Sequence, residues 1–322
     1  MNLAKVIFSK TFLVTGFSAL SLGLVVATAA EAKLTVLTTT TDLRSLVEVV
    51  AGDLVTVEAI AKGTQDPHFI EAKPSFMVKA SKADLVVSVG LDLEVGWLPS
   101  ILRGARNPKV AEGSDGYLEV GNSIDVLEAA TGKVSRADGD VHPQGNPHFT
   151  LDPLRAVKAA NVIAERLAKL DSANAVKYRE NALNFGKGID EKVKLWSARV
   201  AKSGVKKVIS YHKTLTYFFD RFKLDNVAIL EPKPGIPPTS AHILSVINLI
   251  REQKVPLILV ENYFDPTVTR KIIQEVPEVV AHTVPVAVEG EPQIKNLEDL
   301  YEDLIKSVET STENSVSKRK AG

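Results

Sequence analysis

The chain has 322 residues, with 45% hydrophobic residues, 39 basic and 39 acidic side chains and no cysteine, and this length suffices for two domains of ordinary size. The charge balance excludes the strongly basic surface that a nucleic-acid-binding protein would normally carry. The lack of cysteine excludes disulfides, thiolate metal ligands and a lipid-attachable cysteine, so we expect a protein without a lipid anchor.

The first 32 residues have the pattern of an export signal. Lys5 and Lys10 provide positive charge, and a largely apolar stretch over residues 11–26 follows, broken by glycine and serine. This stretch is too short for a comfortable membrane span of about 20 residues. Small residues then offer cleavage after Ala29 or after Ala32. We therefore expect a cleavable signal peptide over residues 1–32 and a periplasmic mature protein, with an uncleaved anchor as the alternative.

Residues 33–171 alternate short β-rich and helical stretches. The predicted strands cover residues 34–39, 54–60 and 84–90, and the predicted helices cover residues 42–51 and 73–83. Alternation of this kind favours a parallel sheet covered by helices on both faces. We expect an N-terminal α/β lobe over this segment.

The segment from Ser172 to Lys202 contains no proline, and its apolar side chains recur every three or four residues. This pattern predicts one helix of about 30 residues, about 45 Å long at 1.5 Å per residue. Gly186 and Gly188 leave open two shorter helices, because each glycine costs about 1 kcal/mol in a helix interior. We expect one rigid linking helix over residues 172–203 that braces two lobes.

The alternation resumes after the linking helix. Predicted strands cover residues 207–210, 226–230, 256–260 and 279–284, and predicted helices cover residues 241–253 and 266–274. The fold class is therefore α/β, with two lobes that each contain a mainly parallel sheet flanked by helices, the second over residues 204–308. Residues 309–322 are rich in serine, threonine and lysine and lack apolar periodicity, so we expect a disordered tail.

Three histidines lie where one strand and helix pattern gives way to the next. His68 and His148 share the local pattern Asp/Asn-Pro-His-Phe, and His212 directly follows the predicted strand at 207–210. Ligands of α/β proteins bind at the carboxyl ends of strands, so these imidazoles can meet in a cleft between the lobes. Single histidines are more often satisfied or simply exposed, but three converging imidazoles would bind a transition metal.

The other histidines give weaker signals. His142 lies in a Gly/Pro-rich loop six residues before His148, where it is either a plain loop residue or one that passes metal inward. His242 lies at a predicted helix start and His282 lies in or beside the last predicted strand. We expect structural roles for both.

From residue 34 to residue 308 the chain resembles the metal-specific solute-binding proteins of ABC transporters, the zinc- and manganese-binding proteins that feed high-affinity importers. The similarity is carried by Asp66-Pro67-His68-Phe69, Asn146-Pro147-His148-Phe149 and Tyr211-His212, together with residues 80–86, 90–94, 151–153 and 231–242. It implies two lobes joined by one long helix, a site made by His68, His148 and His212, and delivery to a permease with its ATPase. A periplasmic metallochaperone is a further candidate partner, and we expect a monomer.

The resemblance also bears on the identity of the metal. The manganese branch of the family commonly has glutamate at the third ligand position, whereas the zinc branch keeps histidine, as at His212. Imidazole-rich sites suit zinc and oxygen-rich sites suit manganese. We therefore expect Zn²⁺ as the transported ligand, with Mn²⁺ as the alternative.

The fourth ligand stays open. The family usually has an aspartate there, but counting forward without gaps from Glu261 places Val284 at this position, and valine cannot bind a metal. Glu289, Glu261 or a water molecule are the alternatives. Asp66, Glu261 and Glu231 are candidates for fixing the ring orientation of the histidines.

Two rival functions remain for comparison. A zinc hydrolase would use a metal-bound water, but the sequence contains no HExxH, GxSxG or phosphate-binding glycine loop. A receptor for an organic solute would need aromatic and arginine anchors rather than histidines. We therefore expect no enzyme but a protein that captures Zn²⁺, with an affinity that falls below about pH 6.5 because the imidazoles must be neutral to bind.

Overall fold

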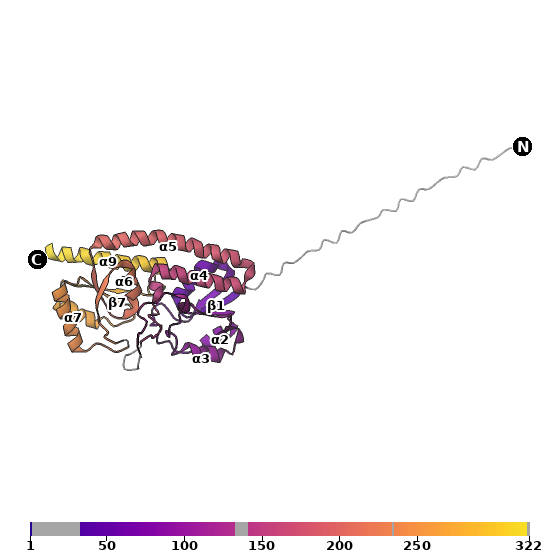
Figure 1. The fold of residues 1–322 in the computed structure, drawn as a ribbon, viewed down its shortest axis with the longest axis horizontal. Coiled ribbons are helices and arrows are strands. Elements are labelled where there is room, and N and C mark those ends of the chain that lie inside the picture. The colour runs from indigo at the N-terminus through magenta and orange to yellow at the C-terminus, as the bar shows by residue number, and fades with distance from the viewer. Residues whose placement is uncertain (2–32, 133–140, 234, 321–322) are drawn as a thin grey trace. The chain divides into compact units, whose positions relative to one another are not determined.

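The computed structural model describes Met1 and residues 33–132, 141–233 and 235–320 (Figure 1). The predicted signal peptide lies almost wholly outside these residues, and Lys33–Gly322 forms a compact unit of its own. Within the described part, no helix combines the length and the apolar character that crossing a membrane requires.

Two parallel four-stranded sheets form the two lobes, as the alternating pattern predicted. The first has the order β2-β1-β3-β4, with β1 at Leu34–Thr38, β2 at Val55–Ala59, β3 at Leu85–Ser88 and β4 at Tyr117–Glu119. The second repeats this order as β6-β5-β7-β8, with β5 at Lys207–Ser210, β6 at Asp225–Ile229, β7 at Leu257–Glu261 and β8 at Val280–Val284. Strands β3 and β7 are buried along their whole length, as expected for sheets covered on both faces.

Helices connect and cover the strands. They are α1 (Thr41–Ala51), α2 (Pro74–Lys82), α3 (Leu98–Ala105), α4 (Pro153–Leu170), α5 (Ala175–Ser203), α6 (Thr216–Phe222), α7 (Ser240–Gln253), α8 (Thr267–Glu275) and α9 (Leu297–Lys320). Side chains set several of the starts: Thr40 accepts a hydrogen bond from Leu43 N before α1, and Asp152 accepts one from Leu154 N before Pro153 opens α4. Strand β4 and helices α3, α6 and α9 were not expected from the sequence pattern.

Helix α5 confirms the single long linking helix. It extends over 29 residues, and a short 3₁₀ turn at Ser172–Asn174 precedes it. Gly186 is buried beside Val157 of α4, where a Cβ would lie 3.0 Å from Val157 Cγ1. The helix ends at Gly204, whose φ of +75° suits a left-handed cap. In Figure 1, α5 runs alongside α4 and α9.

The C-terminal segment differs from expectation. Residues 309–320, expected to be disordered, continue helix α9 to Lys320. Apolar side chains of the first half of α9, including Leu300, Leu304 and Val308, are fully buried. Because extending an existing helix is much easier than starting one, the anchored half supports the polar half.

The two lobes are in direct contact where the first residues of α1 meet the segment after β8. Thr41 Oγ1 donates a hydrogen bond to Val288 O at 2.6 Å, and Val288 N donates one to Asp42 Oδ1 at 2.8 Å. Gly63 lies against the same segment, because a Cβ at this position would be 2.1 Å from Val288 O. A residue with a side chain could not hold the loop after β2 so close to the second lobe.

Candidate metal centre

The structure brings His68, His148 and His212 together. One ring nitrogen from each lies within 4.8 Å of those from the other two. The ring centroids are 5.2 Å apart for His68 and His148, 5.8 Å for His68 and His212, and 6.0 Å for His148 and His212. The three imidazoles therefore face a common point.

His68 is held by the residues just before it. Asp66 Oδ1 accepts hydrogen bonds from the backbone nitrogen of His68 at 3.0 Å and from its Nδ1 at 2.6 Å. The Trp97 indole fixes the loop by donating to Pro67 O at 3.0 Å. Burial opposes ionisation of Asp66, but the hydrogen bonds and charge of His68 outweigh it and keep the pKa of Asp66 below its ordinary value. The aspartate therefore orients the ring so that Nε2 faces the centre.

His148 lies at the start of a 3₁₀ turn at Phe149–Leu151 and is buried. Two buried tyrosines hold this segment: the Tyr217 hydroxyl donates to Asn146 O at 2.7 Å, and the Tyr301 hydroxyl donates to Thr150 O at 2.5 Å. Burial, together with the neighbouring histidines, lowers the pKa of His148 well below its ordinary value, so the ring is neutral at pH 7.

The Nε2 atom of His148 is the most informative atom of the centre. It is buried and has no hydrogen-bond partner among the described residues. A buried polar atom without a partner costs about 1–3 kcal/mol, so such atoms call for an explanation. A neutral imidazole nitrogen that faces two further imidazoles is suited to bind a transition metal ion.

His212 directly follows β5 and Tyr211. Its Nδ1 lies 2.5 Å from Glu231 Oε2, and Glu231 Oε1 accepts a second hydrogen bond from Gly235 N at 2.9 Å. The pair is almost fully buried. A carboxylate that accepts from one ring nitrogen leaves the other nitrogen free for a metal, an arrangement common in zinc sites.

The two glutamates considered as fourth ligands lie elsewhere. Glu289 pairs with Arg44 at 2.8 Å and is half-exposed. Glu261 is buried, accepts a hydrogen bond from the backbone nitrogen of His212 at 3.3 Å, and has its pKa raised to about 8 by burial. Neither glutamate belongs to the group of ligand atoms that includes the ring nitrogens of the three histidines. Val284, at the position where the family usually has an aspartate, is a buried core residue.

Of the remaining histidines, His142 contacts His68, although it is not among the three whose ring nitrogens lie within 4.8 Å of one another. Its Nε2 lies 3.1 Å from His68 Nε2, and its Nδ1 lies 3.0 Å from Leu91 O. Burial, followed by the charge of His68, lowers the pKa of His142 to about 4. His242 Nε2 instead contacts Ile229 O at 2.9 Å, and His282 lies near Thr310, so both are outside the centre.

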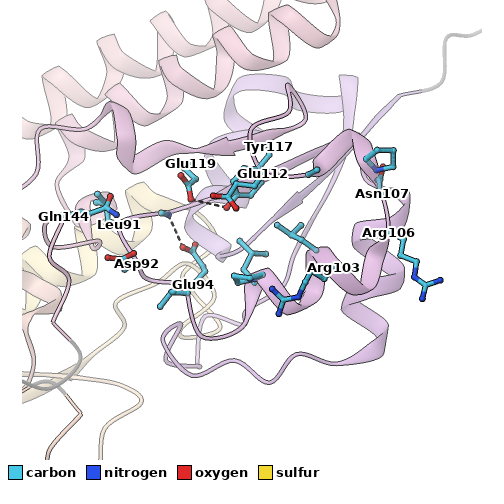
Figure 2. Close-up of a pocket in the computed structure, with 17 residues that line it drawn as sticks. Leu91, Asp92, Glu94, Arg103, Arg106, Asn107, Glu112, Tyr117, Glu119 and Gln144 are labelled. Atoms are coloured by element: carbon cyan, nitrogen blue, oxygen red, sulfur yellow. Dashed lines mark hydrogen bonds between the residues drawn. The ribbon is translucent and has the colours of Figure 1, made fainter. Parts of the chain in front are cut away.

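One cavity in the first lobe adjoins the centre. It has a volume of about 410 Å³ and is lined by His68, His142, Asp92 and Trp97, among others. A larger one of about 680 Å³ is lined by acidic and basic side chains but no histidine (Figure 2). Inside it, Glu94 accepts hydrogen bonds from Thr39 Oγ1 at 2.6 Å, Val89 N at 2.8 Å and Gly90 N at 3.0 Å. This carboxyl ties down the turn that contains Leu91.

Sequence reasoning missed the supports of the centre. Tyr217 and Tyr301 come from α6 and α9, far along the chain from the segment that they hold, and nothing in their local sequence indicates that contact. The Leu91 carbonyl that binds His142 is a backbone group, for which side-chain patterns give no signal.

Comparison with known proteins finds one matching family and several similar metal-binding proteins. A family described as zinc-uptake complex component A, periplasmic (ZnuA), matches residues 36–311. The manganese ABC transporter substrate-binding lipoprotein PsaA of Streptococcus pneumoniae is 26% identical over 245 residues, 76% of this chain and 77% of that protein. A crystal structure of ZnuA aligns with a TM-score of 0.70 and 20% identity, covering 88% of this chain and 99% of that chain. A manganese-bound periplasmic metal binding protein from Candidatus Liberibacter asiaticus aligns with a TM-score of 0.71 and 21% identity, covering 86% and 99%.

Proposed function

The chain belongs to the ZnuA family of periplasmic zinc-uptake components, and from that premise we propose that it captures Zn²⁺ through His68, His148 and His212 and delivers it to an ABC permease. The family provides the extracytoplasmic metal-binding component of ABC transporters, which implies a permease and an ATPase as partners. The observation that carries the proposal is the buried Nε2 of His148, which has no partner among the described residues and faces two further imidazoles.

The choice of zinc rests on the donor atoms. All three atoms that face the common point are imidazole nitrogens, which suit zinc better than manganese. The carboxylates of Asp66 and Glu231 are already engaged by the Nδ1 atoms of His68 and His212. Mn²⁺ is the alternative cargo, because PsaA is named as a manganese transporter component and the structure from Candidatus Liberibacter asiaticus is manganese-bound.

Capture requires neutral, pre-oriented rings. Asp66 and Glu231 each hold one Nδ1 hydrogen, which points Nε2 of His68 and of His212 toward the centre. His148 is kept neutral by its burial. The ion can therefore exchange most of its water shell for imidazoles with little rearrangement of the protein.

The cellular setting follows in part from the family. The protein acts outside the cytoplasmic membrane, whereas PsaA is named a lipoprotein, in contrast to the expectation of a chain without a lipid anchor. The printed sequence contains no cysteine to which a lipid could be attached. Beyond this coarser placement, we propose that the protein is a free periplasmic monomer, that it is loaded directly or by a metallochaperone, and that it acts as a binding component rather than as an enzyme.

Metal binding tests this function. We expect protein purified without added metal to contain zinc, and we expect calorimetry with a calibrated competing chelator to give one tight Zn²⁺ site and a much weaker Mn²⁺ site. His212→Ala should lose the tight site, whereas the control His242→Ala, changed at a ring held by Ile229 O, should retain it. Retention of full zinc affinity by His212→Ala would contradict the assignment.

A further inference from the structure

We propose that His142 supplies a fourth nitrogen ligand to the captured ion and so determines both how firmly and how selectively zinc is held. This inference rests on the proposed function, because it concerns the same centre. It would replace the glutamates and the water that sequence reasoning left open as fourth ligands.

The first support is the spacing of the two rings. His142 Nε2 and His68 Nε2 are 3.1 Å apart, with the ring centroids at 5.2 Å. Two nitrogens that bind one tetrahedral zinc ion at about 2.1 Å each lie about 3.4 Å from one another. The two Nε2 atoms are therefore already separated by nearly the distance of a ligand pair.

The second support is the hydrogen-bond pattern on the far side of each ring. The Leu91 carbonyl can only accept, so His142 Nδ1 carries the hydrogen of that contact. The Asp66 carboxylate likewise accepts from His68 Nδ1. In the neutral rings both Nε2 atoms then present lone pairs to one another. Two lone pairs at this distance repel unless a proton or a metal ion lies between them, and a zinc ion can take the place of the proton.

The third support is the rigidity of the turn at Leu91, whose carbonyl contacts the far side of the His142 ring. Leu91 and Asp92 have φ angles of 55° and 64°, in the left-handed region that is unfavourable for residues with side chains. Glu94 maintains this turn by accepting hydrogen bonds from the amide of Val89 and from that of Gly90, which lines the same cavity as Glu94 (Figure 2). Such strain persists only where the surroundings enforce it, and here it directs the Leu91 carbonyl at His142.

The position of His142 also fits a ligand that closes the site last. Its ring lines the cavity of about 410 Å³ together with His68 and Asp92. His142 is not among the three residues whose nitrogens lie within 4.8 Å of one another, so its ring approaches His148 and His212 when the ion binds. Val141 and His142 are half-buried, and Pro143 and Gln144 are exposed, so few packing contacts oppose this small displacement of the ring.

Direct counting of ligands tests the proposal. X-ray absorption at the zinc edge should show four imidazoles in the wild-type protein, three imidazoles and one oxygen in His142→Ala, and four imidazoles in the control His242→Ala. Three imidazoles in the wild-type protein, or the same spectrum for wild type and His142→Ala, would overturn the role of His142 while leaving zinc capture intact. A wild-type protein that binds no zinc would overturn both proposals.

Affinity gives an independent measurement. His142→Ala should bind zinc at least about tenfold more weakly, a change of about 1.4 kcal/mol or more. His142→Asp, which offers an oxygen in place of the nitrogen, should raise the ratio of Mn²⁺ affinity to Zn²⁺ affinity. Circular dichroism should show that both variants fold. Unchanged zinc affinity in His142→Ala would again exclude His142 as a ligand.

Discussion

The metal centre and the paired helices α5 and α9 differ in whether their polar side chains have hydrogen-bond partners within the protein. Along the helix pair, Arg199 binds both Glu302 and Glu309, and the Trp196 indole donates to Glu302 at 2.9 Å. In the centre, by contrast, His148 Nε2 has no partner among the described residues. The helix pair satisfies its polar groups and supplies stability, whereas the centre leaves its nitrogens available for the ion. Substitutions should therefore separate stability from affinity.

The sharpest test of this separation removes the largest side chain of the helix pair. Trp196 is buried and packs edge-on against Tyr301, with ring centroids 5.6 Å apart. Trp196→Ala should lower the free energy of unfolding by about 3–5 kcal/mol, because it leaves a cavity in the core. Zinc affinity of the folded protein should change little, because Tyr301 can keep its hydrogen bond to Thr150 O without Trp196. Chemical denaturation and calorimetry measure the two quantities, with Trp196→Phe as an intermediate control. A large loss of zinc affinity in folded Trp196→Ala would refute the separation.

A second test addresses the contact between the two lobes, where Asp42 accepts a hydrogen bond from Val288 N. Burial raises the pKa of Asp42 to about 6 from 3.8, against the opposing effect of hydrogen bonds from Val288 N and Thr150 Oγ1. The folded protein therefore binds the proton more tightly than the unfolded chain does. The stability from this group is fully present below about pH 4 and is lost as the pH rises through 6.

Asp42→Asn isolates this effect, because its amide can donate to the Thr150 hydroxyl and its oxygen can still accept from Val288 N. The free energy of unfolding of the variant, relative to wild type, should rise by about 2.4 kcal/mol between pH 4 and pH 7, which is most of the effect of about two pKa units at 1.36 kcal/mol each. Denaturation across this pH range measures it. A difference between the two proteins that does not vary with pH would show that Asp42 ionises normally.

The third test acts on the centre without removing a presumed ligand. Glu231 accepts the Nδ1 hydrogen of His212. Mutating a residue that hydrogen-bonds to a metal ligand in this way typically lowers metal affinity by about 10–100-fold. Glu231→Ala should weaken zinc binding by about this factor, and Glu231→Gln, which keeps an oxygen acceptor, should lie near the lower limit. Calorimetry with a competing chelator measures both. Equal zinc affinities for wild type and Glu231→Ala would show that the Glu231 carboxylate does not contribute to metal binding through His212.

Much of this architecture could be read from the sequence. The strands at 34–39 and 207–210 and the long helix at 172–203 agree with the structure to within a few residues, because hydrophobic periodicity is a local property. The three histidines could be placed in one cleft because each follows a strand or precedes a helix. The contact between His142 and His68 could not be predicted, since it depends on how a loop far from His68 in sequence folds back over Leu91.

The C-terminal helix α9 also depends on contacts between residues that are distant in sequence. Residues 309–320 have the composition of a disordered segment, yet they continue α9. The Arg199 pair with Glu309 lies 110 residues apart in sequence, so no local pattern reveals it. The glycines in α5 left a similar question open. Sequence alone could not decide whether Gly186 and Gly188 break the helix, because the packing of α5 against α4 was unknown.

These two glycines provide the last and smallest test within the stabilising region. A Cβ on Gly188 would meet nothing within 4 Å, whereas a Cβ on Gly186 would lie 3.0 Å from Val157 Cγ1. Gly188→Ala should therefore stabilise the protein by about 1 kcal/mol, the difference in helix propensity, and Gly186→Ala should gain less because α4 must shift. In a Val157→Ala background, which removes the crowding methyl, Gly186→Ala should recover part of that gain. Thermal and chemical denaturation compare the four variants, and zinc affinity should be the same in all of them. Equal stabilisation by the two single glycine substitutions would mean that close packing of α4 on α5 does not limit the residue at position 186.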